Sequence, residues 1–283
     1  MSNKRNEARR KQAASALPPE HLVARTKNPL LNFAIPTELV DLPSKGRLYQ
    51  VGHPLHGKET VEIRYMTAKE EDILSSQSLL RKGVAIDRML NNVLIEEDLD
   101  IQQLTVGDKN AVMYAVRISG YGAEYKATIQ CADCDALYAE TFDLAEYVNC
   151  YTEPTTSNTR TTDNGTLEIT LPKSQALVEL RAITGADEEK IIKIQEMKKK
   201  NNLPEEPLTD LIKMMVHSVN GVLDRDNIHE FVDHLPAIDS KHIRDTYKNS
   251  MPNVLFTQES QCGECGVTTE VEVPITGEFF WPE

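Results

Sequence analysis

Long apolar runs are missing from this chain of 283 residues, and aromatic residues make up only 6% of it. No apolar stretch reaches the ~18 residues that a membrane-spanning helix needs, so no such helix is expected. Residues 1–15, MSNKRNEARRKQAAS, lack the apolar core of a secretory signal. Because only five cysteines occur and no such signal is recognisable, we expect folding in a reducing cytoplasm without a disulfide framework.

The net charge of −13 is distributed unevenly along the chain. Residues 1–28 contain seven Lys and Arg and two Glu, a formal charge of +5, which leaves −18 on the remainder. This composition predicts a disordered basic arm that is either simply solvated or binds a partner. The acidic remainder disfavours nucleic acid as a partner, because phosphates would be repelled.

The pattern of apolar residues and turn signals predicts an α+β fold that is mainly helical and carries short antiparallel hairpins. A strand is expected over 59–66 and a hairpin over 166–183. Helices are expected over 67–83, 84–95, 109–122, 186–202, 208–220, 226–235 and 239–249. Thr67 with Glu70 matches a capping box, and Asp108 is expected to cap the helix that follows it.

Two Cys-x-x-Cys pairs, in QCADCD and QCGECG, are the most specific feature of the sequence. Each pair lies between two short predicted strands, over 123–130 and 136–144 and over 253–260 and 268–275. Two such hairpin tips that face each other offer four sulfurs in the tetrahedral geometry that zinc prefers in structural sites. We therefore predict a zinc-ribbon-like site with one structural zinc per chain, bound by Cys131, Cys134, Cys262 and Cys265.

Other interpretations of the cysteines stay open. Four buried thiols without a metal are one alternative, and a redox dithiol is less suitable because a thioredoxin-like motif opens a helix after a strand. A catalytic zinc is disfavoured, because four cysteines leave no open position for water. Cys150 lies outside both pairs and is interpreted as a packed or free thiol.

The long separation of the two pairs is explained if a helical segment is inserted between the hairpins. The expected organisation is a basic arm (1–28), an N-terminal extended segment with a strand and helices (29–122), the zinc-ribbon-like hairpins (123–149 and 254–283) and an inserted hairpin and helical region (150–253).

Signatures of catalysis are weak. GHPLHGKE, residues 52–59, approaches a phosphate-binding loop, but Glu59 replaces the Ser or Thr that holds Mg²⁺, and a strand follows where a helix is required. His53 and His56 lack a third metal ligand and are interpreted as exposed turn residues. No catalytic triad or carboxylate pair stands out. The chain is therefore predicted not to be an enzyme, with no catalytic residues and no small-molecule substrate.

The stretches ELVDLPSKGRLY, EIRYMTAKEEDIL and RISGYGAEY resemble the T4-type bacteriophage base plate hub family. The resemblance covers about residues 38–145 and extends to the closing Cys-x-x-Cys at 262–265. It implies a structural or assembly protein of the contractile tail, with other tail or base plate hub proteins as partners. It also implies that the chain folds in the host cytoplasm and that a retained subunit lies in the virion tail base plate.

Two alternative functions stay open. The first alternative is an assembly chaperone that is absent from the finished tail. The second alternative is a nucleic-acid-binding zinc-ribbon protein, although Asp133, Asp135 and Glu264 within the cysteine turns speak against it. At the end of the chain, ITGEFFWPE is interpreted either as a docking segment for a partner or as aromatic residues that fold back over the hairpins.

Overall fold

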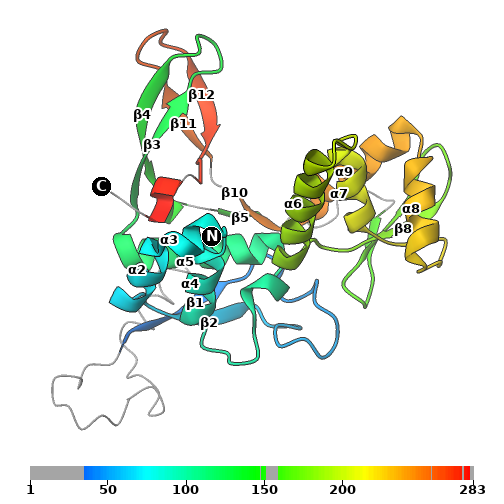
Figure 1. The fold of residues 1–283 in the computed structure, drawn as a ribbon, viewed down its shortest axis with the longest axis horizontal. Coiled ribbons are helices and arrows are strands. Elements are labelled where there is room, and N and C mark those ends of the chain that lie inside the picture. The colour runs from blue at the N-terminus through cyan, green and yellow to red at the C-terminus, as the bar shows by residue number, and fades with distance from the viewer. Residues whose placement is uncertain (1–34, 147, 151–158, 256, 276, 281–283) are drawn as a thin grey trace.

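The structure is a computed structural model, which describes residues 35–146, 148–150, 159–255, 257–275 and 277–280. The expected α+β class is confirmed, because helices alternate with short antiparallel sheets (Figure 1). The basic arm at 1–28 lies outside the described residues. Within the described part of the chain, no helix has the length and apolar character required to cross a membrane.

The elements have the following bounds. The α-helices are α2 Ala68–Ser75, α3 Gln77–Arg81, α4 Ala85–Val93, α5 Val106–Tyr121, α6 Gly185–Lys200, α7 Pro207–Met215, α8 Arg225–Asp233 and α9 Ala237–Ser250. The 3₁₀ turns are η3 Ile101–Gln103, η4 Leu144–Glu146 and η5 Gly277–Phe280. The strands are β1 Thr37–Asp41, β2 Thr60–Arg64, β3 Glu124–Gln130, β4 Leu137–Asp143, β5 Val148–Cys150, β6 Thr159–Thr161, β7 Leu167–Thr170, β8 Leu177–Leu180, β9 Val216–Val219, β10 Asn253–Leu255, β11 Thr257–Gln261 and β12 Thr268–Glu272.

The first apolar core is built around α5. This helix is buried over most of its length because its sequence is apolar on nearly every side, as in a helix surrounded by other elements. The β1–β2 sheet, α2, α4 and the lower ends of the hairpins pack around it. Buried members of this core include Val61, Leu74, Leu90, Val112, Val116 and Phe142.

The prediction that Asp108 caps α5 is wrong. Thr105 is the N-cap, and its hydroxyl accepts the backbone N–H of Asp108. The Asp108 carboxylate is fully buried and turns toward the segment after β1. It accepts hydrogen bonds from the backbone N–H and hydroxyl of Ser44, at 2.9 and 2.5 Å, and from the Tyr49 hydroxyl at 2.7 Å. Asp108 therefore fixes the turn of LPSKG to the start of α5.

The single helix expected over 67–83 is divided in two. The capping box of Thr67 and Glu70 is confirmed, and α2 starts there. The chain then becomes extended at Ser76, with φ −69° and ψ 106°, before α3 begins. A run of Ser and Gln favours such a break, because Ser side chains compete with the helical hydrogen bonds of the backbone.

A second core lies in the segment between the two hairpins, where a hairpin and helices are expected but a four-stranded sheet is found. Strands β6, β7, β8 and β9 form an antiparallel sheet in that order, and α7, α8 and α9 contribute to its core. The helix expected over 208–220 is wrong beyond Met215, where Val216–Val219 instead pair with β8. β-branched residues at the first and last positions of β9 favour this strand. The expected helices near 186–202, 226–235 and 239–249 are confirmed as α6, α8 and α9.

The pairing of β5 with β10 returns the chain to the first hairpin. Asn253 lies opposite Cys150 in this antiparallel pair, immediately before β11 begins. Strand β10 also packs on α5, where a Cβ added to Gly107 would lie 2.1 Å from the Pro252 carbonyl oxygen. The hairpins β3–β4 and β11–β12 consequently stand side by side and project from the body (Figure 1).

The chain end folds back, as one of the two interpretations of ITGEFFWPE expected. Phe279 and Phe280 are buried at 0% and 1% exposure, so these two side chains are not a free docking segment. Phe279 makes edge-to-face contacts with Tyr114 of α5 and Tyr125 of β3, at ring centroid distances of 5.4 and 5.2 Å. Trp281 lies outside the described residues.

Candidate metal centre

The two cysteine pairs occupy turns with the same backbone geometry. In the first turn, Cys131 donates its N–H to the Ala136 carbonyl at 2.9 Å, and its carbonyl accepts from the Asp135 N–H at 3.0 Å. In the second, Cys262 bonds to Val267 and Gly266 in the same way, at 3.0 and 2.9 Å. The residue four positions after the first cysteine has positive φ in both turns, 58° at Asp135 and 74° at Gly266. Gly and Asp tolerate this backbone conformation, so the sequence favours both turns locally.

The structure brings the four predicted ligand residues together. Their sulfur atoms all lie within 4.8 Å of one another, with Cys131 Sγ 3.7 Å from Cys265 Sγ and Cys134 Sγ 3.8 Å from Cys262 Sγ. All four are free cysteines, and no disulfide joins them. Cys131 and Cys262 are buried, whereas Cys134 and Cys265 are exposed. Each short sulfur–sulfur distance thus joins a cysteine of one hairpin to a cysteine of the other.

The backbone and the neighbouring thiols act on the sulfurs in opposite directions. The backbone amides of Cys134 and Asp133 lower the pKa of the Cys131 thiol to about 7. At Cys134 the amide of Ala136 favours the thiolate, but the thiols of Cys265, Cys131 and Cys262 together with burial outweigh it and raise the pKa to about 12. At Cys265 the Val267 amide and the Cys134 thiol favour the thiolate, but burial and the thiols of Cys131 and Cys262 outweigh them and raise the pKa. Like charges at this distance oppose one another, so four thiolates require a cation between them.

The donor set fits a closed metal site. Tetrahedral zinc with Zn–S distances of ~2.3 Å separates its sulfurs by ~3.8 Å. The two short sulfur–sulfur distances across the hairpins agree with this spacing. Four cysteine sulfurs could therefore hold one metal ion, and soft thiolate ligands suit zinc better than calcium or magnesium.

Polar side chains also join the hairpins below the cysteines. The Tyr138 hydroxyl lies 2.9 Å from the Ser260 hydroxyl, which itself donates to the Glu140 carboxylate. Gln258 donates its side-chain amide to the Thr141 carbonyl at 3.2 Å. These residues alternate with outward-facing ones along β4 and β11. Sequence reasoning missed them, although period-2 alternation marks the positions that face the other hairpin.

The histidines that the structure describes take no part in this group. His53 stacks on Tyr49 with ring centroids 4.4 Å apart, and its Nδ1 accepts the backbone N–H of Leu55. His56 Nδ1 lies 2.7 Å from the Tyr49 carbonyl oxygen. Both therefore order the turn, and among the described residues only the four cysteines form a candidate metal-binding group. The side chain of Cys150 lies outside the described part of the chain.

A third turn repeats the backbone pattern of the cysteine turns without any cysteine. In LPKSQA, Leu171 bonds to Ala176 and Gln175 as each first cysteine does, at 2.9 and 3.1 Å, and Gln175 has φ 57°. The amides of Lys173 and Ser174 donate to the carboxylate of Asp239 at 2.7 and 2.8 Å. These positions match the Asp133 and Cys134 amides that favour the Cys131 thiolate. The turn therefore presents its amides to an anion whether that anion is a sulfur or a carboxylate.

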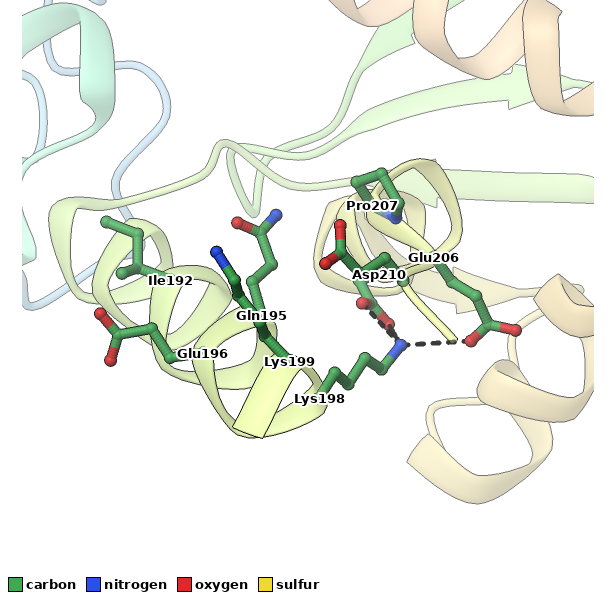
Figure 2. Close-up of a pocket in the computed structure, with 9 residues that line it drawn as sticks. Ile192, Gln195, Glu196, Lys198, Lys199, Glu206, Pro207 and Asp210 are labelled. Carbon is green, nitrogen blue, oxygen red and sulfur yellow. Dashed lines mark hydrogen bonds and ion pairs between the residues drawn. The ribbon is translucent and has the colours of Figure 1, made fainter. Parts of the chain in front are cut away.

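A groove between α6 and α7 lies outside the cysteine site and has a volume of about 340 Å³. Lys198 crosses it to reach both carboxylate oxygens of Asp210, at 2.9 and 2.8 Å, and Glu206 at 3.1 Å (Figure 2). Its lining contains no cysteine, serine or histidine. The prediction that the chain is not an enzyme stays a prediction.

Comparison with known proteins gives one match. The family model described as T4 bacteriophage base plate protein matches residues 37–281, which is most of the chain. No curated protein matches. No solved structure matches.

Proposed function

The chain belongs to the T4 bacteriophage base plate protein family, and from this premise we propose that it is a structural or assembly protein of the base plate hub whose hairpins are clasped by zinc. The family indicates a structural or assembly role in the phage base plate. The observation that carries the finer proposal is the convergence of four cysteines from two hairpins that are far apart in the sequence.

The zinc in this proposal is a structural element. Cys131 and Cys134 would hold it from the first hairpin, and Cys262 and Cys265 from the second. A bound zinc would neutralise part of the thiolate charge and close the chain into a loop around the second core. Such a rigid projecting pair of hairpins suits an element that is positioned against other tail proteins.

Charge favours protein over nucleic acid as the partner of the hairpins. Residues 124–143 and 257–272 contain nine acidic side chains and a single basic one, Lys126. The acidic residues are Glu124, Asp133, Asp135, Glu140, Asp143, Glu259, Glu264, Glu270 and Glu272. A surface of this sign repels phosphates, which argues against the nucleic-acid-binding zinc ribbon.

Partners and place follow from the same proposal. The chain would fold in the host cytoplasm and contact other base plate hub proteins, either as a resident subunit or as a chaperone that leaves. Mass spectrometry of purified particles and of infected lysate separates these two roles. A resident subunit is found in both, a chaperone in the lysate alone. If a phage lacking the gene builds complete base plates, the proposed assembly role is wrong.

A further inference from the structure

Helix α6 exposes two large apolar side chains among charged ones. Only Gly185 and Asp187 are buried in its sixteen residues, and none of its isoleucines nor its methionine is. Ile192 and Met197 are 54% and 52% exposed. Propensity alone rarely stabilises a helix in water, so an amphipathic helix normally covers such residues by packing. Two apolar side chains flanked by charges of both signs suit a contact surface with an apolar centre and a polar rim.

Six of the exposed residues form one continuous stripe, here called the α6 stripe. It consists of Glu189, Ile192, Lys193, Glu196, Met197 and Lys200, all of them exposed. Spacings of three and four residues place these side chains on one side of a helix. In Figure 2, Ile192 and Glu196 lie at the edge of the groove between α6 and α7, whereas Lys198 crosses that groove to reach Asp210. All six residues of the α6 stripe are exposed, and two of them, Ile192 and Glu196, also border the groove toward α7.

The order of residues along the α6 stripe is self-complementary when the helix is reversed. Read from either end, an acid is matched by a lysine and an apolar residue by an apolar residue. A twofold axis between Ile194 and Gln195 would place Glu189 opposite Lys200, Ile192 opposite Met197 and Lys193 opposite Glu196 of a second copy. Each contact occurs twice, as a twofold interface requires.

We propose that the α6 stripe is a homodimer interface, in which two copies of the chain pack their α6 helices antiparallel. The apolar pair would lie at the centre of the interface and the charged pairs on both sides of it. Parallel packing would place Glu189 and Lys200 against their own equivalents, so like charges would oppose it. The charges thus select the antiparallel arrangement, and the apolar side chains supply the burial.

We expect the two copies to associate weakly. In the single chain, Lys193 already pairs with Glu189 at 2.6 Å, so the second copy competes with an exposed ion pair. One helix pair also covers less than the ~1,600 Å² of total surface that a standard stable interface buries. The dissociation constant of the dimer is therefore expected to be micromolar or higher. Dimerisation becomes complete only where the chain is concentrated. This inference does not depend on zinc or on the base plate role.

Sedimentation equilibrium of the full chain tests the proposal. The mass should rise with concentration from 31.8 kDa toward twice that value. Glu196→Lys and Lys193→Glu each place like charges opposite one another and should weaken the dimer by about tenfold or more. Mixing the two variants restores opposite charges at every position, so the mixture should associate as well as the native chain.

Two controls make the result specific. Lys241→Glu and Asp245→Lys reverse exposed charges on α9 and should leave the mass unchanged at every concentration. Ile192→Asp should abolish the dimer while the circular dichroism spectrum stays native, because the side chain is already exposed. A native chain that remains monomeric at several hundred micromolar overturns the proposal. So does a mixture of the two charge variants that stays as weak as each variant alone.

Discussion

The hydroxyl of Tyr138 on β4 lies 2.9 Å from the hydroxyl of Ser260 on β11, so the two hairpins contact each other without any help from a metal. At their base, the Tyr125 hydroxyl also donates to the Pro274 carbonyl at 2.9 Å. These two contacts therefore hold the lower parts of the hairpins together independently of the cysteines. At the tips, among the described residues, the four cysteines approach one another across the two hairpins, and each turn adds its own local hydrogen bonds.

Replacing one cysteine should consequently loosen the tips before the body. We expect Cys262→Ser to lower the melting temperature and to increase amide hydrogen exchange and protease cleavage around 128–140 and 258–270. Exchange in α5 should change little, because its core does not include the site. The matched control is Cys150→Ser, which removes the cysteine outside both pairs. If Cys262→Ser melts and exchanges like the native protein, the clasp has no structural role.

Metal content gives the second prediction. Elemental analysis of freshly purified protein should find one zinc per chain, and Cys131→Ser should reduce it strongly. Cobalt exchanged into the native protein should show the intense visible absorption of a tetrahedral thiolate site. Zinc-free native protein purified without chelator would contradict the prediction.

The cysteine site was accessible to sequence reasoning because its signal is chemical and local. Two Cys-x-x-Cys pairs with turn residues behind them identify both the tips and their common partner. The contacts of Tyr138 and Ser260 carry no such signal, since Ser and Tyr occur on many strands. Their meeting depends on the register of two separate hairpins, which only the folded chain fixes.

The misread elements have a common cause. Val216–Val219 directly follow α7 and are expected to continue it, but pairing with β8 decides their conformation. Asp108 has the residue type of a cap, yet Thr105 takes that place and frees the carboxylate for Ser44 and Tyr49. In each case a partner distant in the sequence overrides a local preference. The capping box of Thr67 and Glu70 was predictable because both of its members are neighbours.

The buried Asp108 gives a prediction about stability. Asp108→Ala leaves the Ser44 amide and the hydroxyls of Ser44 and Tyr49 without their acceptor, which should cost ~3 kcal/mol of unfolding free energy. Asp108→Asn should cost only about 1 kcal/mol, because both hydroxyls can reorient to accept from the amide. Urea unfolding of the three proteins checks the order. Equal losses for Ala and Asn would show that the hydrogen bonds are not the cause.

The capping boxes predict how stability depends on pH. Burial raises the pKa of Glu70, but hydrogen bonds from Arg64 and Thr67 outweigh it and lower the pKa from 4.5 to about 2. A lowered pKa in the folded state means that the contribution is complete above about pH 5 and is lost as the pH falls toward 2. Asp187, held by Arg181 and Thr184 in the same arrangement, also has its pKa lowered to about 2.

Unfolding free energies measured from pH 7 to pH 3 check this sign. Glu70→Gln should lower stability at neutral pH by ~2 kcal/mol and flatten the decline at acidic pH. Asp72→Asn is the control, because it removes an exposed carboxylate from the same helix. A Glu70→Gln profile parallel to the native one would contradict the role of this carboxylate.

The last prediction concerns the end of the chain, where the ring of Phe279 lies against Tyr114 and Tyr125 and within 5.9 Å of the Arg117 guanidinium carbon. Arg117 is itself buried and donates to the carbonyls of Gly122 and Glu124, so it joins α5 to the first hairpin. Removing the ring opens a cavity beside this cation and weakens its aromatic surroundings.

Phe279→Ala should therefore lower the unfolding free energy by ~3–5 kcal/mol, and Phe279→Leu by less, because leucine refills part of the cavity. Thermal melts of both variants measure the loss, and Leu223→Ala, at a position that is 60% exposed, should melt like the native chain. A stable Phe279→Ala protein that fails to join other tail proteins would instead restore the docking interpretation of this segment. An unstable Phe279→Ala protein would show that Phe279 acts in the core, where its aromatic contacts hold the hairpin to the body.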